Sequence, residues 1–522
     1  MISYLKRGLA IASIVLASYL PNTIIKNSSL ENILVSSCQA QELANDGSSE
    51  PGFIPPPELR LPPPPPANMA SAETFIPYPP PPAQPQARSE KKNPPSPPIL
   101  MAKIKQGEAR DWNATPNDVN GLMTEMKKNA NANYSSEVKS LADISSDPEK
   151  NPILYKSTHY RFSFNEQERK KLREYLLAGG TLIINPGRGS RPAFESAVSE
   201  IQTMFPETRM LPLGLDHPAL HSYYDISKVK CQIGTKGEKT ILPVIMGLTI
   251  NCRTMVFVPE LGLDAGWSGK EGKRDIDRIY SEESSRKIGM NVITYATSMR
   301  AWQKNFVHAS KFVDIDKTSA GKVSITQIVY DGEWKTRHAG LDVLLQGFNA
   351  RTDIPVKFAR NEIKLSDTKI FDSPIIYITG HERFSLSEPE LKIFREYVSK
   401  GGVVFAEACC GRKGFDSSFR EQMKKVFPES SLEKIPQSDS IFKMPNNIQT
   451  LEITPALAGK IGKPIMLPEL EAIKIGNYYG VIYSQFGLAG GWEMSPNPYS
   501  LSYGDLASSA LGQNILMSIM TR

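Results

Sequence analysis

The segment NPILYKSTHYRFSFNEQERKKLREYLLAGGTLIIN (151–185) recurs as SPIIYITGHERFSLSEPELKIFREYVSKGGVVFAE (373–407), 222 residues further along the chain. In each copy a short apolar run precedes an amphipathic stretch, which opens with a capping residue and a glutamate three positions later. This pattern predicts a helix, and the Gly-Gly pair that follows predicts its end. A second apolar run comes next. A strand, a helix and a buried strand within about 35 residues are typical of a βαβ unit, and therefore of a parallel sheet.

The repeat continues on both sides of this unit. Its further matches are Trp112/Trp334, Phe205-Pro206/Phe427-Pro428 and GLDAGW (262–267)/GLAGGW (487–492). Helices around 195–204 and 417–426 and strands near MVFVPE and GVIYSQ complete each copy. We therefore predict an α/β protein with two homologous flavodoxin-like three-layer (αβα) domains and mostly parallel sheets, at 101–300 and 322–522, with a linker at 301–321.

The first hundred residues differ from the rest in composition. Lys6 and Arg7 precede the apolar run LAIASIVLASYL (9–20), a pattern typical of an export signal and short for a membrane span. We predict that residues 1–40 are an export signal or an uncleaved anchor. Residues 51–98 hold 19 of the 41 prolines, so we predict a disordered Pro-rich linker at 41–100. The protein is then exported, either periplasmic or anchored in the inner membrane through its N-terminal segment.

The charge of the chain is spread out. The 61 basic and 55 acidic side chains leave a net charge of +6, and no basic run is long enough to predict a nucleic-acid site. The partner that we expect is an unknown envelope protein, and the sequence leaves the oligomeric state open. No motif points to a cofactor or a metal site.

Residues with reactive side chains follow the strands of the second unit. Ligands of an open parallel sheet bind at the carboxyl ends of its strands, where Cys409, Cys410, His381 and Glu407 are expected. A thiol, an imidazole and a carboxylate are the parts of a cysteine nucleophile with its base and orienting acid. The first unit has Gly187 in place of the first cysteine and an arginine in place of the second, so either one unit is active or neither is. The alternative is that both cysteines are small residues in a turn.

Other polar or aromatic residues at sheet edges and turns are candidates for ligand binding. They are Asp331, Glu333, Trp334, Gln485 and Trp492 in the second unit, and His159, Arg188, Asp216 and His217 in the first. The turn NPGRGSR (185–191) allows anion binding through backbone N–H groups and its arginine. In an exported protein Cys231 and Cys252 allow a disulfide, which the sequence does not decide.

The spacing of these residues resembles the bacterial family called domain of unknown function 4159. The resemblance rests on Gly380-His381, Glu388, Arg395, Tyr397, Gly401-Gly402, Phe427-Pro428, Gly491-Trp492 and Asn514, with Asp216-His217-Pro218 in the first unit. It implies a fold related to class I glutamine amidotransferases, with no established activity. The ACCG turn lies where such folds place their nucleophile, but their downstream His-x-Glu pair is not evident. The sequence favours a non-catalytic binding or envelope-assembly role. The alternative is a thiol-dependent hydrolase or amidotransferase that uses Cys409 or Cys410 with His381.

Overall fold

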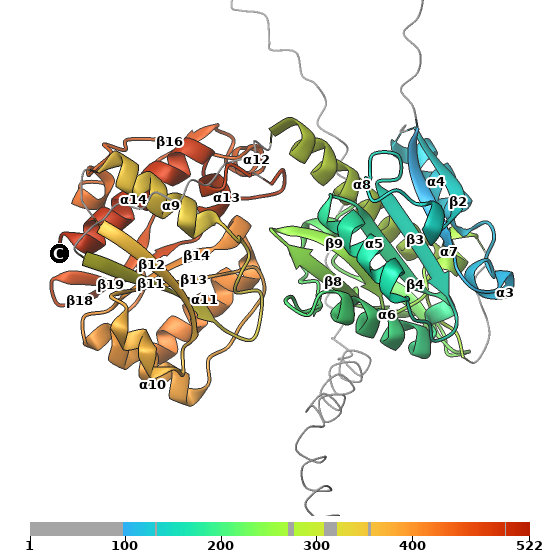
Figure 1. The fold of residues 1–522 in the computed structure, drawn as a ribbon, viewed down its shortest axis with the longest axis horizontal. Helices are drawn as coiled ribbons and strands as arrows, with labels where there is room; N and C mark the ends of the chain where they lie inside the picture. Colours follow the sequence, from blue (N-terminus) through green and yellow to red (C-terminus); the bar gives the residue numbers. More distant parts are fainter. Residues whose placement is uncertain (1–97, 131–132, 270–275, 307–320, 353–355, 496) are drawn as a thin grey trace, which may run out of the picture. The chain divides into compact units, whose positions relative to one another are not determined.

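The computed structural model describes residues 98–130, 133–269, 276–306, 321–352, 356–495 and 497–522. Residues 98–522 form one compact unit, which contains two similar α/β domains (Figure 1). The predicted export signal, nearly all of the Pro-rich linker and most of the linker between the domains lie outside the described residues.

Each domain is built on a seven-stranded sheet. In the first domain the order is β2 (Tyr134–Ser140), β1 (Ile99–Lys105), β3 (Ile153–Thr158), β4 (Thr181–Pro186), β9 (Arg253–Pro259), β8 (Ile245–Ile250) and β5 (Leu211–Pro212). In the second it is β12 (Val356–Lys364), β11 (Gly321–Val329), β13 (Ile375–Gly380), β14 (Val403–Ala408), β19 (Tyr478–Ser484), β18 (Glu471–Ile475) and β15 (Glu433–Lys434). The first five strands of each order are parallel, the sixth is antiparallel to the fifth, and the seventh is antiparallel to the sixth.

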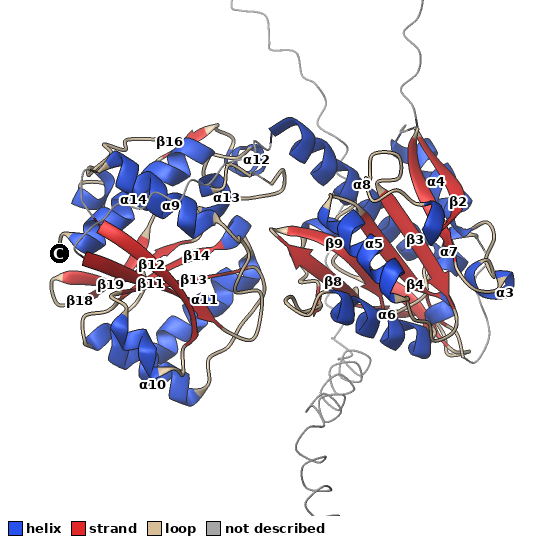
Figure 2. Ribbon diagram, in the orientation of Figure 1, coloured by secondary structure: helices blue, strands red, loops and turns tan. Residues whose placement is uncertain are grey.

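The parallel part of each sheet has the strand order 2-1-3-4-5 of flavodoxin-like folds. Helices cover both of its faces, as Figure 2 shows. In the first domain α5 (Glu166–Leu177) and α6 (Arg191–Met204) cover one face, and α4 (Asp118–Ala130), α7 (Asp264–Trp267) and α8 (Glu282–Phe306) the other. In the second domain α10 (Glu388–Ser399) and α11 (Lys413–Val426) lie opposite α9 (Gly340–Arg351), α13 (Ala489–Trp492) and α14 (Asp505–Met520). The predicted fold class is confirmed.

Smaller elements complete the two domains. They are α3 (Ala109–Trp112), β6 (Val229–Ile233), β7 (Lys239–Ile241), β10 (Arg278–Tyr280), β16 (Leu451–Glu452), α12 (Pro455–Ile461) and β17 (Ile465–Met466). Within the part of the chain that the structure describes, no helix is both long enough and apolar enough to span a membrane.

The repeated βαβ unit forms for the reasons that its sequence indicates. A capping box starts α5 at Asn165 and α10 at Ser387, and the glycine after each helix has the positive φ that ends it, 106° at Gly179 and 96° at Gly401. Strands β4 and β14 are buried along their whole length, as central parallel strands are. Helix α6 begins four residues before the predicted start at 195, because the Ser190 side chain caps it.

Candidate functional site

A buried cluster of three cysteines and one histidine lies where the two domains meet. One ligand-type atom from each of Cys252, His381, Cys409 and Cys410 lies within 4.8 Å of all the others. Three of the four residues come from the second domain, and Cys252 comes from the first. The sequence placed three of them together and left open whether the fourth, Cys252, forms a disulfide with Cys231. In the structure that disulfide is not formed, because the Cys252 thiol faces the other cluster cysteines.

The two adjacent cysteines stand in the turn between β14 and α11. Successive side chains of a strand point to opposite faces, so neighbouring cysteines of a continuing strand would diverge. Here Cys410 has a φ of 57°, in the left-handed region, and the Sγ atoms of Cys409 and Cys410 are 3.8 Å apart. The turn therefore directs both thiols to one place.

Cys252 reaches the cluster from the tip of the β8–β9 hairpin. The hairpin has a two-residue turn, with φ values of 51° at Asn251 and 59° at Cys252. Two positive φ values define a type I′ turn, whose usual second residue is glycine. The Cys252 Sγ lies 3.3 Å from the Cys409 Sγ, and the Cys252 carbonyl accepts a hydrogen bond from Asn497 Nδ2 at 3.0 Å. The tip of the first domain's hairpin thus packs into the second domain.

His381 follows β13 and is held by Glu333. Its Nδ1 lies 2.7 Å from Glu333 Oε2, while its Nε2 is buried and has no hydrogen-bond partner among the described residues. Because Nδ1 is engaged by the carboxylate, Nε2 is the ring atom directed at the thiols. Burial alone would lower the pKa of His381, but the Cys252 and Cys410 thiols and the Glu333 carboxylate raise it well above its usual value.

The three thiols differ in their ease of ionisation. Burial raises the pKa of Cys252 and of Cys409. The neighbouring thiols of Cys252 and Cys409, together with His381, lower the pKa of Cys410 well below its usual value. The first thiolate of the cluster therefore forms at Cys410.

Two buried arginines lie next to the cluster. Arg337 pairs with Glu493 at 3.4 Å, and its Nε has no hydrogen-bond partner among the described residues. Arg412 binds both carboxylate oxygens of Asp216, at 3.0 and 3.1 Å, and also Glu382 at 2.8 Å. Since Asp216 belongs to the first domain, this ion pair is a second polar contact between the domains.

Glu407 has a structural role in the second domain. Its carboxylate accepts hydrogen bonds from the Tyr377 hydroxyl at 2.6 Å and from the backbone N–H groups of Leu488 and Ala489. It thereby anchors the turn before α13. Asn185, its counterpart in the first domain, accepts from the N–H of Leu263 at 2.8 Å in the same way. The acid that orients His381 is Glu333, not Glu407.

The other second-domain candidates lie away from the thiols. Trp492 packs in the core near Tyr377 and donates to the Ser508 carbonyl at 2.9 Å. Three more make contacts elsewhere: Asp331 pairs on the surface with Arg209, Trp334 lies under Lys335, and Gln485 donates to Glu469 at 3.2 Å.

The first-domain candidates do not form an equivalent site. The Arg188 guanidinium pairs with Asp277. The backbone N–H of Arg188 donates to Asp264, the residue that matches Ala489 of the second domain. His159 lies against Gly187. His217 is buried between Thr254 and the N–H of Ala219, and burial lowers its pKa well below the usual value, so this ring is neutral.

The space beside the cluster is small. The cavity next to Cys252, His381 and Cys410 has room for about 10 Å³ of water, roughly one molecule.

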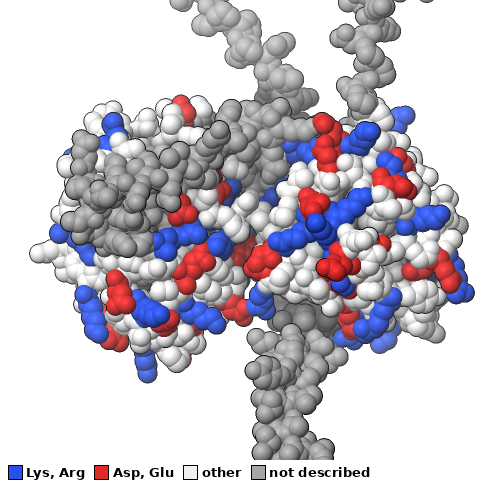
Figure 3. Space-filling model, in the orientation of Figure 1, with Lys and Arg blue, Asp and Glu red and all other residues white. Residues whose placement is uncertain are grey.

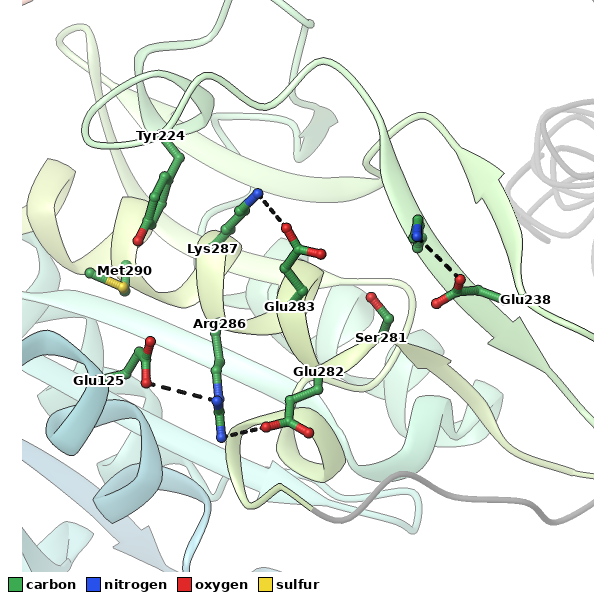
Figure 4. Close-up of a pocket in the computed structure, with 10 residues that line it drawn as sticks. Glu125, Tyr224, Glu238, Ser281, Glu282, Glu283, Arg286, Lys287 and Met290 are labelled. Carbon is green, nitrogen blue, oxygen red and sulfur yellow. Dashed lines mark hydrogen bonds and ion pairs between the residues drawn. The ribbon is translucent and has the colours of Figure 1, made fainter. Parts of the chain in front are cut away.

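A larger groove of about 390 Å³ lies elsewhere, between α4, α8 and β6 (Figure 4). Its charges pair with one another, Lys287 with Glu283 and Arg286 with Glu125 and Glu282. Basic and acidic side chains are likewise interspersed on the face shown in Figure 3.

The fold and the cluster define a tandem flavodoxin-like α/β protein with a buried thiol–imidazole centre. A family model described as Domain of unknown function (DUF4159) matches residues 100–297 and again residues 324–520. The chain belongs to this family and carries two copies of its domain, as the resemblance indicated. No curated protein matches the chain.

Proposed function

We propose that this protein is a non-catalytic tandem-domain protein that is exported and binds or assembles with a component of the cell envelope. The observation that supports the non-catalytic role is the burial of the thiols. Cys409 is 1% and Cys410 8% exposed, and the adjoining cavity has room for about one water molecule. A carbonyl substrate needs to approach a nucleophile to about 3–3.5 Å. First-domain residues, among them His217 and Tyr295, help to line the small cavity beside the thiols.

A thiol-dependent hydrolase is the second candidate, for a specific reason. His381 lies between Glu333 and the thiols, and Cys410 has a left-handed φ at a strand-to-helix turn. Nucleophile elbows use a strained turn of this kind. The lowered pKa of Cys410 also favours a thiolate.

Alkylation of the full chain separates the two candidates. We expect iodoacetamide to label Cys410 of the folded protein far more slowly than free cysteine at every pH from about 6 to 9, with a chelator present, because the thiol is buried. Mass spectrometry of the peptides gives the rate for each cysteine. Rapid, stoichiometric labelling of Cys410 at neutral pH in the folded, chelated protein would overturn the non-catalytic role.

The proposed location rests on the N-terminal sequence. The positive residues before LAIASIVLASYL and the Pro-rich segment after it are typical of an export signal followed by a tether. We expect the full chain in the periplasmic or membrane fraction of its cell, and a chain lacking residues 1–40 in the cytoplasm. Recovery of both chains in the cytoplasm would contradict export.

A further inference from the structure

We propose that Cys252, His381, Cys409 and Cys410 bind one zinc ion, which links the two domains. Three cysteines and one histidine are a ligand set of structural zinc sites, since zinc favours thiolates and imidazole. The four ligand atoms already lie within 4.8 Å of one another and are buried. The site belongs to neither domain alone.

The spacing of the sulfur atoms fits a tetrahedral site. With Zn–S bonds of about 2.3 Å, ligands of a tetrahedron are about 3.8 Å apart. The Sγ atoms of Cys409 and Cys410 are 3.8 Å apart, and those of Cys252 and Cys409 are 3.3 Å apart. No large movement is needed to place an ion among them.

His381 is oriented as a ligand. Its Nδ1 is held by Glu333 at 2.7 Å, and its buried Nε2 lacks a hydrogen-bond partner among the described residues. A carboxylate on the second ring nitrogen is the arrangement that fixes the tautomer of metal-binding histidines. A buried polar atom without a partner is unfavourable in free energy, and a metal ion that binds the lone pair of Nε2 would remove this cost.

The backbone at two of the ligands points to the same conclusion. Cys252 and Cys410 both have a positive φ, 59° and 57°, which glycine adopts without strain and cysteine does not. The turn at Cys410 belongs to the fold, because Arg188 at the matching position of the first domain has a φ of 52°. At Cys252, however, a cysteine stands where the turn favours glycine. Both positions hold thiols that converge on one point.

Buried positive charge also lies beside the site. Three thiolates, a neutral histidine and a zinc ion sum to one negative charge. Arg337 is 5% exposed, and its Nε has no hydrogen-bond partner among the described residues. Arg337, which also pairs with Glu493, thus places buried positive charge beside the negatively charged site.

A zinc ion held by four protein ligands has no open position for substrate. The metal proposal is therefore compatible with a non-catalytic protein, but it does not depend on export or on an envelope partner. Its failure would leave the labelling test of the non-catalytic role unaffected, because that test is made in chelated protein.

The first test uses the unmodified full chain. We expect about one zinc ion per chain by plasma mass spectrometry after purification without chelator, because four ligands close the site. Replacement by Co²⁺ should give the visible bands of tetrahedral cobalt and the near-ultraviolet bands of cobalt–thiolate bonds. Reduced protein that binds neither ion, or a Cys252–Cys409 disulfide in its place, would overturn the proposal.

Variants of the hairpin turn supply a matched pair. Cys252→Gly suits the type I′ turn but removes a ligand, so we expect zinc affinity to fall by about tenfold or more. Asn251→Gly changes the adjacent turn residue and leaves all four ligands, so it should keep wild-type zinc content. Circular dichroism confirms that each variant is folded. Equal zinc affinities of the two variants, measured by competition with a chelator, would exclude Cys252 as a ligand.

Discussion

Asp216 and Glu382 bind the same arginine, yet their pKa values move in opposite directions. Burial alone raises the pKa of Asp216, but Arg412 and the backbone N–H groups of Lys413 and Gly414 lower it below its usual value. For Glu382 the effect of burial exceeds that of Arg412, and its pKa rises. Because Asp216 takes two of the three Arg412 hydrogen bonds, it carries the charge of this contact.

The Asp216–Arg412 contact should make stability depend on acid pH. A carboxyl group whose folded pKa is below its unfolded value stabilises the fold above the unfolded pKa of about 4, and this contribution is lost as pH falls through the folded pKa. Asp216→Asn should therefore be less stable than wild type at pH 7 and lose less stability between about pH 5 and 3.

Urea unfolding at a series of pH values measures this difference. Asp225→Asn, at an exposed carboxylate that pairs with His221, is the control and should follow the wild-type curve. Parallel curves for Asp216→Asn and wild type would contradict the role of the contact.

Glu407 should behave as a structural residue. Glu407→Ala leaves the Tyr377 hydroxyl and two backbone N–H groups without an acceptor, which should cost about 2 kcal/mol or more. Glu407→Gln should cost much less, since Asn185 fills the same position in the first domain. Thermal unfolding measures both values. Equal losses for Ala and Gln would show that the charge, and not the hydrogen bonds, matters.

At the scale of elements, the repeated βαβ unit was predictable because its signals are local. The capping boxes, the apolar stripes of α5 and α10 and the terminal glycines each act within one helix length. Cys409, Cys410 and His381 could be placed near one another because parallel strands end at one edge. Cys252 could not, because its contact depends on how one domain packs against the other.

One local signal for Cys252 does exist in the sequence. It is the dipeptide Asn251-Cys252 between two apolar strands, where a two-residue turn favours Asn-Gly. The second domain has Gly476-Asn477 at the matching turn, with a positive φ of 60° at the glycine. A cysteine where a glycine is expected marks a side chain that the structure needs.

The two capping boxes should make equal contributions. Asn165→Ala and Ser387→Ala should each cost about 1 kcal/mol in the free energy of unfolding, because Asn165 accepts from the N–H of Glu168 and the Ser387 hydroxyl donates to the carboxylate of Glu390. Lys392→Ala, on the exposed side of α10, should change stability by less than about 0.5 kcal/mol. Denaturant unfolding checks all three. A neutral effect at either cap would show that the neighbouring packing determines the helix start.

At the scale of the molecule, the contact between the domains should make unfolding cooperative. Arg412→Ala leaves two half-buried carboxylates, Asp216 and Glu382, without their cation, a change that costs about 1–3 kcal/mol. We expect one calorimetric transition for wild type and two for Arg412→Ala. Arg412→Lys should lose less stability than Arg412→Ala, because it keeps the positive charge. Two transitions already in the wild type would show that the domains unfold independently.

The ligands of the cluster come from positions that the two domains do not share. Asn477 stands where the second domain would need Cys252, and Gly187 and Arg188 stand where the first would need Cys409 and Cys410. A symmetric dimer of either domain would therefore lack a complete set, because an isologous interface repeats the same residues twice. Fusion in one chain guarantees one copy of each half at a high effective concentration. The tandem arrangement thus fixes a one-to-one ratio of two copies of the domain that have different residues at the cluster.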